Sequence, residues 1–167
     1  SPRFAASYYL YGSSFAIPIA DIDRTGFFLC VGANPLVSNG SLMTAPDMRG
    51  RLRQLRQRGG KLVVVDPRRS ETARVADEHI AIRPGTDAAL LLAMSAVLLR
   101  SGRARMDAIR DDMIGWDEVE RRLRKLDLDA CARLTGIAAE RITRLAVEFA
   151  ERSSSVAYSR IGVCNSR

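Results

Sequence analysis

The stretch that most constrains the fold of this chain is a run of aliphatic residues, Leu62 to Val65, followed at once by Asp66 and Pro67. A short run of this kind predicts a strand that is buried on both faces, as strands of parallel sheets are. Pro67 has no amide hydrogen and is expected to end the strand. Asp66 therefore falls at a carboxyl end, just outside which open parallel sheets bind their ligands. A carboxylate there can accept hydrogen bonds from a pair of sugar hydroxyls.

A second strand end follows. Residues 79–82 predict a strand, and residues 83–87 predict the turn from it into a helix. Gly85 can adopt a positive φ in that turn, and Thr86 or Asp87 can cap the helix. We expect the Asp87 carboxylate to be exposed beside the turn. It would suit a base that carries adjacent N–H donors, such as guanine.

Strands and helices alternate along the chain, which predicts the α/β class with parallel strands and right-handed crossovers. We expect a doubly wound, mostly parallel, Rossmann-like sheet with helices on both faces and a helical insertion around residues 103–153. The expected strands are residues 27–31, 61–65, 79–82 and 155–161, and the expected helices are residues 41–58 and 88–99. The whole chain, residues 1–167, is expected to form a single α/β domain, with a leader segment (1–20) before a nucleotide-binding core (21–167).

The segment after the first expected strand, residues 32–41, is rich in turn-forming residues. It lacks the G-x-G-x-x-G spacing that is typical of NAD-binding loops. Gly32 would let the backbone approach a ligand closely, and the Asn34 side chain can donate and accept hydrogen bonds at once. From the pattern alone, a plain strand-to-helix connection is the favoured interpretation.

The basic charge leaves two classes of partner open. The chain of 167 residues has a formal net charge of +7, and arginine supplies almost all of its positive charge because lysine occurs only at Lys61 and Lys125. Such a charge favours a nucleic acid or a phosphate-bearing cofactor, and an ordinary solvated surface explains it equally well. The arginines of residues 41–58 have no aromatic residue between them to stack on bases. A solvated outer helix face is therefore favoured there over a nucleic-acid-binding surface.

The three cysteines are too few and too far apart for a metal centre. Cys30, Cys131 and Cys164 form no Cys-x-x-Cys pair, so we expect neither a zinc site nor an iron–sulfur cluster in this chain, and predict three reduced thiols. The most apolar run, residues 88–99, is too short to span a bilayer. The chain starts at Ser1 without methionine, so we expect a piece of a longer protein, in which missing targeting signals prove little.

Four short motifs within residues 22–162 carry a resemblance to a known family. They are Gly-x-Asn-Pro at residues 32–35, Asp-Pro-Arg at residues 66–68, Arg-Pro-Gly-Thr-Asp at residues 83–87 and Thr-Gly-x-x-Ala-Glu-x-Ile at residues 135–142. With Ala76-Asp77 between the second and the third, they resemble the molybdopterin oxidoreductases of the dimethyl sulfoxide reductase superfamily. That group includes formate dehydrogenases and periplasmic nitrate reductases. Four motifs in the right order are far more specific than any one of them.

The resemblance implies an internal fragment of a larger multidomain enzyme, which binds the guanosine and pyrophosphate part of a molybdopterin guanine dinucleotide. By analogy, Asp66 would bind the ribose hydroxyls and Asp87 the guanine N–H donors. Gly32, Asn34 and Arg68 would line the cofactor. The other residues expected at the cofactor are Ser38, Pro67, Gly85 and Thr86. We assign no catalytic residue and no metal ligand to this chain, because the family's metal ligand lies upstream of the matched region.

The implied cofactor is bis-molybdopterin guanine dinucleotide with molybdenum or tungsten, and the resemblance allows an iron–sulfur cluster in the parent chain. The implied partners are this pterin cofactor, the remaining domains of the parent oxidoreductase and an electron-transfer subunit. We expect no nucleic acid partner and no membrane span in this fragment. A cytoplasmic location is expected, and a periplasmic one stays open because any signal would lie upstream.

We expect the isolated fragment to be inactive. Two alternatives of other classes stay open at this point. One is the central domain of a thiamine-diphosphate enzyme, which has a similar sheet and sometimes a Gly-Ala-x-Pro loop. That domain is not expected to carry the Asp-Pro-Arg and Pro-Gly-Thr-Asp motifs together. The other is a basic nucleic-acid-binding module, which only the charge suggests.

Overall fold

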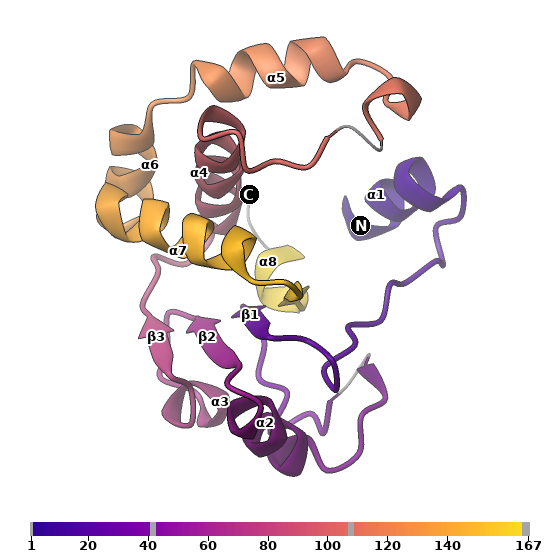
Figure 1. The fold of residues 1–167 in the computed structure, drawn as a ribbon, viewed down its shortest axis with the longest axis vertical. Helices are drawn as coiled ribbons and strands as arrows, with labels where there is room; N and C mark the ends of the chain where they lie inside the picture. The colour runs from indigo at the N-terminus through magenta and orange to yellow at the C-terminus, as the bar shows by residue number, and fades with distance from the viewer. Residues whose placement is uncertain (1, 41–42, 107–108, 165–167) are drawn as a thin grey trace.

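The computed structural model describes residues 2–40, 43–106 and 109–164, which form a parallel sheet between two layers of helices (Figure 1). The strands are β1 (Phe27–Val31), β2 (Lys61–Val65), β3 (Glu78–Ile80) and β4 (Ser155–Ser159), in the sheet order β3-β2-β1-β4. Phe27 lies opposite both Lys61 and Ser155, and Val63 lies opposite Glu78. The predicted α/β class with a parallel sheet is confirmed.

The two central strands are apolar because both of their faces are covered. Every residue of β1 is buried, and so is every residue of β2 after Lys61. Successive side chains of a strand point to opposite faces, so these residues divide between two separate clusters. One cluster contains Phe28, Cys30, Leu62 and Val64, and the other contains Phe27, Leu29, Val31, Val63 and Val65. Burial of each large apolar side chain contributes roughly 1.5–3 kcal/mol, so the sheet has a core on each side.

One face of the sheet is covered by α2 (Met48–Gln57) and α3 (Glu71–Arg74), which connect β1 to β2 and β2 to β3 (Figure 1). The helix predicted over residues 41–58 is wrong at its start. It begins at Met48, where Asp47 accepts a hydrogen bond from the Gly50 amide at 3.1 Å. Pro46 precedes this cap and cannot donate a helical hydrogen bond. Residues 41 and 42 lie outside the described part of the chain.

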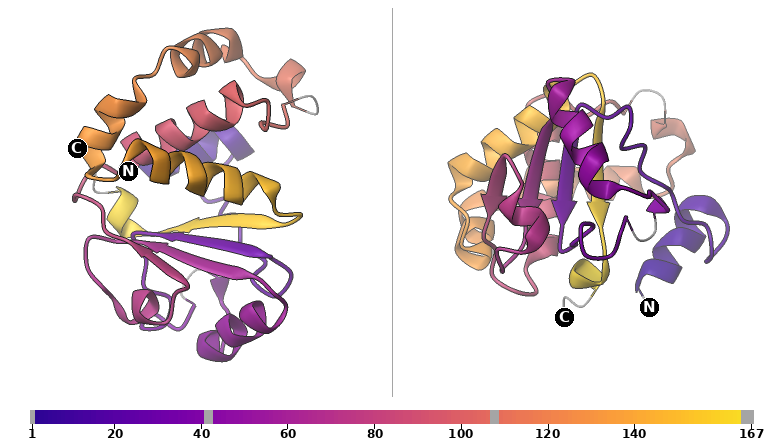
Figure 2. Two further views of the ribbon diagram at one scale, coloured as in Figure 1. Left: turned by 60° about the vertical axis from the view of Figure 1, so that its left-hand side comes forward. Right: turned by 90° about the horizontal axis from the view of Figure 1, so that it is seen from below.

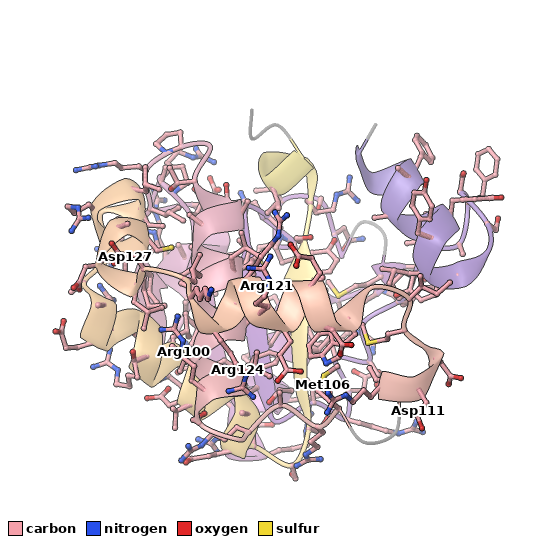
Figure 3. All side chains as sticks on the ribbon, turned by 90° about the horizontal axis from the view of Figure 1, so that it is seen from above. Arg100, Met106, Asp111, Arg121, Arg124 and Asp127 are labelled. Atoms are coloured by element: carbon pink, nitrogen blue, oxygen red, sulfur yellow. The ribbon has the colours of Figure 1, made fainter. Side chains whose placement is uncertain are left out.

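The other face is covered by α4 (Asp87–Arg100), α6 (Leu128–Thr135) and α7 (Ala139–Glu151), and α5 (Trp116–Arg124) packs on α4 (Figure 2). A 3-10 turn, η2 (Arg110–Asp112), precedes α5. Arg100 donates from Nη2 to the carbonyl oxygens of Leu123 (3.0 Å) and Leu126, which ties the end of α4 to the end of α5 (Figure 3). The predicted helical insertion around residues 103–153 is therefore present.

The strand order reverses between β1 and β4. The chain lays β2 and β3 on one side of β1, crosses the opposite face of the sheet through α4 to α7, and adds β4 on the other side of β1. This is the doubly wound arrangement that the alternation of strands and helices predicts. In open parallel sheets, ligands bind at the carboxyl end of such a switch point.

Two predicted strand ends are wrong. β3 ends at Ile80 rather than at residue 82, because the Arg83 amide donates to the Thr135 carbonyl (2.9 Å) and the chain leaves the sheet for the end of α6. β4 ends at Ser159 rather than at residue 161. A short helix, α8 (Ile161–Cys164), follows it, and residue 165 lies outside the described part of the chain.

The first helix, α1 (Pro2–Tyr11), lies to one side of the sheet (Figure 1). Its large side chains are exposed, most of all Tyr9 at 85%. The segment that follows it forms a hollow of about 240 Å³ with β4, lined in part by residues 16–20 and 156–159. No helix within the described residues is long and apolar enough to cross a membrane.

Candidate functional site

The carboxyl ends of the strands meet along one edge of the sheet, and the predicted site residues gather there. Gly32 follows β1, Asp66 follows β2, the turn of residues 83–87 follows β3, and Gly162 lies just after β4. At the switch point two backbones touch: a Cβ on Gly32 would lie 3.2 Å from the Cα of Gly162, and a Cβ on Gly162 would lie 2.7 Å from the Gly32 carbonyl oxygen. Gly32 has the positive φ (57°) that the loop requires. The close approach predicted at Gly32 is thus made to the chain's own backbone.

Asp66 is held at the end of β2 by three hydrogen bonds. Its amide donates to the Ile80 carbonyl (3.2 Å), its carbonyl contacts His79 Nε2 (2.9 Å), and its Oδ1 accepts from the Arg68 amide (2.8 Å). The side chain is half-buried, and no cation pairs with it among the described residues. One carboxylate oxygen therefore stays available to accept hydrogen bonds from a ligand.

Asp87 is the first residue of α4 and is buried, with 5% of its surface exposed. The expectation of an exposed carboxylate is therefore wrong. Thr86 occupies the N-cap position of the helix, but its side chain makes no capping bond, since its hydroxyl donates to the Arg83 carbonyl instead (2.7 Å). Burial and, to a smaller extent, the negative charge of Asp66 raise the pKa of the Asp87 carboxyl. Asp66 and Asp87 therefore lie near one another at the same edge of the sheet.

The Asn34 side chain is directed toward α3. Its Nδ2 donates to Glu71 Oε2 (2.7 Å), and its Oδ1 accepts from the Thr72 hydroxyl (2.7 Å) and the Thr72 amide (3.2 Å). The Thr72 hydroxyl also accepts from the Leu36 amide (3.2 Å). The side-chain amide of Asn34 thus holds the loop after β1 against the start of α3. Its direct contact with a cofactor stays a prediction.

The other predicted residues lie on the outside of the same edge. Pro67, Arg68 and Gly85 are exposed, and Gly85 has the expected positive φ of 78°. Arg68 lies 3.7 Å from Glu71 Oε2, a loose pair that leaves its guanidinium free to turn toward an anion. Ser38 is exposed as well, and its hydroxyl donates to the Asn34 carbonyl (3.3 Å).

Cys30 belongs to the core, as its place in an apolar strand predicts. The thiol is buried and donates to the Ala33 carbonyl (3.3 Å). Burial, with the nearby charge of Asp66, raises the pKa of Cys30 to about 12. A thiol held in this way is a poor metal ligand. Within the described residues, no three His, Cys, Asp or Glu side chains come together as a metal site would need.

Sequence reasoning missed Gly162. Its contact with Gly32 depends on the pairing of β4 with β1, two strands that are far apart in the sequence. Nothing in the sequence around either glycine indicates that their two backbones come into contact. The strand order, once known, would have placed the loop after β4 beside the loop after β1.

Comparison with known proteins agrees with this geometry. Residues 5–117 match the family model described as molybdopterin oxidoreductase, which is more than half of the chain. The chain belongs to the molybdopterin oxidoreductase family. This membership excludes the thiamine-diphosphate alternative and confirms the resemblance that the four motifs carry.

The relatives are members of the dimethyl sulfoxide reductase group. Probable oxidoreductase YoaE of Bacillus subtilis is 30% identical over 92% of this chain and 22% of its own length. Formate dehydrogenase H of Escherichia coli is 29% identical over 87% of this chain and 19% of its own. Among solved structures, acetylene hydratase from Pelobacter acetylenicus superposes with a TM-score of 0.71 at 29% identity, over 86% of this chain and 19% of that one. The chain therefore spans about a fifth of the length of these relatives.

Proposed function

We propose that this chain holds the guanosine and diphosphate part of a molybdopterin guanine dinucleotide, at the carboxyl edge of its sheet. The observation that carries the proposal is the pair of acids Asp66 and Asp87, which follow the adjacent strands β2 and β3 and pair with no cation among the described residues. Acids placed without a compensating charge are suited to accept hydrogen bonds from N–H and O–H groups of a ligand.

Each part of such a nucleotide has a matching group in the chain. The half-buried Asp66 would accept from the ribose hydroxyls, and Asp87 would accept from the adjacent N–H groups of guanine. The exposed Arg68 would bind a phosphate oxygen once it leaves Glu71. Gly32, Gly85, Thr86, Pro67 and Ser38 would line the nucleotide, and Asn34 would contribute by holding the loop that contains Gly32.

The buried state of Asp87 fits a specificity role. A carboxylate at 5% exposure is removed from water, so a base that satisfies both of its oxygens gains more than it would at the surface. Adenine offers no pair of adjacent N–H donors and would leave the carboxylate unsatisfied. We expect guanine nucleotides to be preferred for this reason.

The parent protein would be a molybdenum or tungsten oxidoreductase, and this chain would be one of its cofactor-binding parts. Relatives of this chain are named as a nitrate reductase, a formate dehydrogenase and an acetylene hydratase. Proteins with such different names share this segment, so it is expected to hold the cofactor rather than to select the substrate. The metal is supplied by the cofactor, and the isolated chain is expected to convert neither formate nor nitrate.

Titration of the chain with GDP tests the proposal, because GDP carries the guanosine and the diphosphate of the cofactor. We expect GDP to bind more tightly than ADP, and Asp87→Asn to weaken GDP binding by roughly tenfold or more, as loss of a hydrogen bond to a charged group predicts. Asp111→Asn is the matched control, since Asp111 is exposed on η2, away from the sheet edge (Figure 3). Equal binding of GDP and ADP, or equal losses in the two variants, would contradict the proposal.

A further inference from the structure

A second surface, away from the carboxyl edge, combines an apolar floor with unpaired positive charge. It is a groove of about 290 Å³ between α2, the end of α3 and the loop after β1. Leu36, Leu52 and Val75 form its floor, and Arg49, Arg53 and Arg56 form its rim. We call these six residues the α2 groove. α2 and α3 lie side by side on the face of the sheet opposite to α4 (Figure 1).

The arginines in and just after α2 differ in whether their guanidinium groups have partners within the chain. Arg56 pairs with Asp77 at 3.0 Å and donates to the Val75 carbonyl, so it closes one end of the groove. Arg51 and Arg58 are occupied elsewhere, by Asp23 and by the Ile22 carbonyl. All of these contacts are made within the chain, and they leave two arginines of α2 to account for.

Arg49 and Arg53 are those two. Both are exposed, and neither has a hydrogen bond or an ion pair with any described residue. They lie one helical turn apart and therefore on the same side of α2, along the rim of the groove. Two neighbouring cations without an acid repel one another, and an anionic partner would remove that repulsion.

We infer that the α2 groove binds an acidic polypeptide segment that carries an aliphatic side chain. The aliphatic side chain would enter between Leu36, Leu52 and Val75, and carboxylates on either side of it would pair with Arg49 and Arg53. Acidic residues one turn apart on a helix match the spacing of these two arginines. This inference does not depend on the nucleotide site.

Other anionic partners fit the groove less well. A nucleic acid needs a longer track of cations and, for single strands, aromatic residues on which bases stack, and the six lining residues include no aromatic one. A membrane surface is recognised by a larger cluster of cations than two free arginines provide. The enclosed apolar floor instead suits a single side chain of a polypeptide.

The probe is a short fluorescein-labelled peptide built of the repeat Glu-Glu-Leu-Glu, and its binding to the chain is followed by fluorescence anisotropy. We expect saturable binding that weakens as salt rises. Replacement of leucine by serine in the peptide, or Val75→Thr in the protein, should weaken binding several-fold, because each makes the apolar contact polar. The double variant Arg49→Ala/Arg53→Ala should weaken binding at least tenfold.

The matched control is Arg121→Ala/Arg122→Ala, which removes the same charge from α5 on the far side of the sheet from α2 (Figure 1). All four arginines are exposed. Arg121 and Arg122 pair with Glu118, but surface ion pairs contribute little to stability, so both double variants should unfold close to the temperature of the parent chain. Equal losses in the two double variants would mean that net charge alone attracts the peptide, and would overturn the inference. Absence of binding would overturn it too. So would duplex DNA or phosphatidylserine vesicles that bind more tightly than the peptide and depend on Arg49 and Arg53.

Discussion

The charge of Asp66 acts on the carboxyl group of Asp87, although the two residues follow different strands. Burial is the larger cause of the raised pKa of Asp87, and the charge of Asp66 adds to it. Such an arrangement costs stability and is not relieved by any cation among the described residues. Groups that are kept at such a cost are concentrated at binding sites, where a ligand supplies the missing partner.

Replacement of Asp87 by asparagine should stabilise the chain at neutral pH. The folded pKa of Asp87 lies above its ordinary value of 3.8, so stability falls as the pH rises from that value through the folded pKa, and the cost is present wherever the carboxyl is ionised in the folded chain. We expect Asp87→Asn to raise the free energy of unfolding at pH 7 and to leave it nearly unchanged at pH 3. Urea unfolding at the two pH values measures this, with Asp111→Asn as the control. A loss of stability at pH 7 would contradict it.

The contact between Asn34 and Thr72 should matter for the loop after β1. Thr72 is fully buried, and its hydroxyl bonds both the Asn34 side chain and the Leu36 amide. Thr72→Val takes the side-chain acceptor from the Leu36 amide and leaves Asn34 Oδ1 with the Thr72 amide alone, which should cost about 1–3 kcal/mol of unfolding free energy. Hydrogen exchange at the Leu36 amide should become faster.

The control for this prediction is Thr143→Val, on α7, since Thr143 makes no hydrogen bond through its side chain to a described residue. That change should alter the unfolding free energy by less than about 0.5 kcal/mol. If both threonine variants lose equal stability, or if exchange at Leu36 stays slow in Thr72→Val, the hydroxyl does not hold the loop.

Local sequence pattern was sufficient to predict where the candidate site residues gather. The apolar run before Asp66 and the turn before Asp87 each mark a strand end by themselves, and parallel strands bring their carboxyl ends to one edge. The four motifs then identify the family. These features act over a few residues, so a single sequence contains them in full.

Contacts between distant segments could not be predicted in this way. The burial of Asp87 depends on which segments pack around the start of α4, and the partners of Asn34 come from α3, 37 and 38 positions later. The contact of Gly32 with Gly162 requires the pairing of β1 with β4. The start of α2 was misplaced for a local reason, because Pro46 and Asp47 outweigh the helical pattern around them.

Cys30 should resist alkylation in the folded chain. Its pKa of about 12 keeps the thiol protonated, and the apolar strand around it excludes reagents. Burial raises the pKa of Cys131 as well. In a Cys164→Ser background, iodoacetamide at pH 8 should label neither cysteine until urea unfolds the chain, after which mass spectrometry should find both labelled. Rapid labelling of Cys30 under native conditions would contradict its assignment to the core.

Acid should weaken the fold through Glu78. This residue begins β3 and so lies away from the carboxyl ends of the strands, where the candidate site is. Burial opposes ionisation of Glu78, but hydrogen bonds from Lys61 (3.2 Å) and Arg141 (3.1 Å) outweigh it and lower the pKa of the carboxyl below its ordinary value of 4.5. A lowered acid pKa gives stability that is present above pH 4.5 and is lost as the pH falls through the folded pKa. Glu78→Gln should cost about 1–3 kcal/mol at pH 7, since it removes the carboxylate that Lys61, Arg141 and Arg144 share and only Lys61 and Arg144 retain Glu148, and it should cost much less at pH 3. Unfolding free energies measured between pH 3 and 7 should therefore converge for the two proteins at the acid end; parallel curves would mean that Glu78 contributes through its packing and not through its charge.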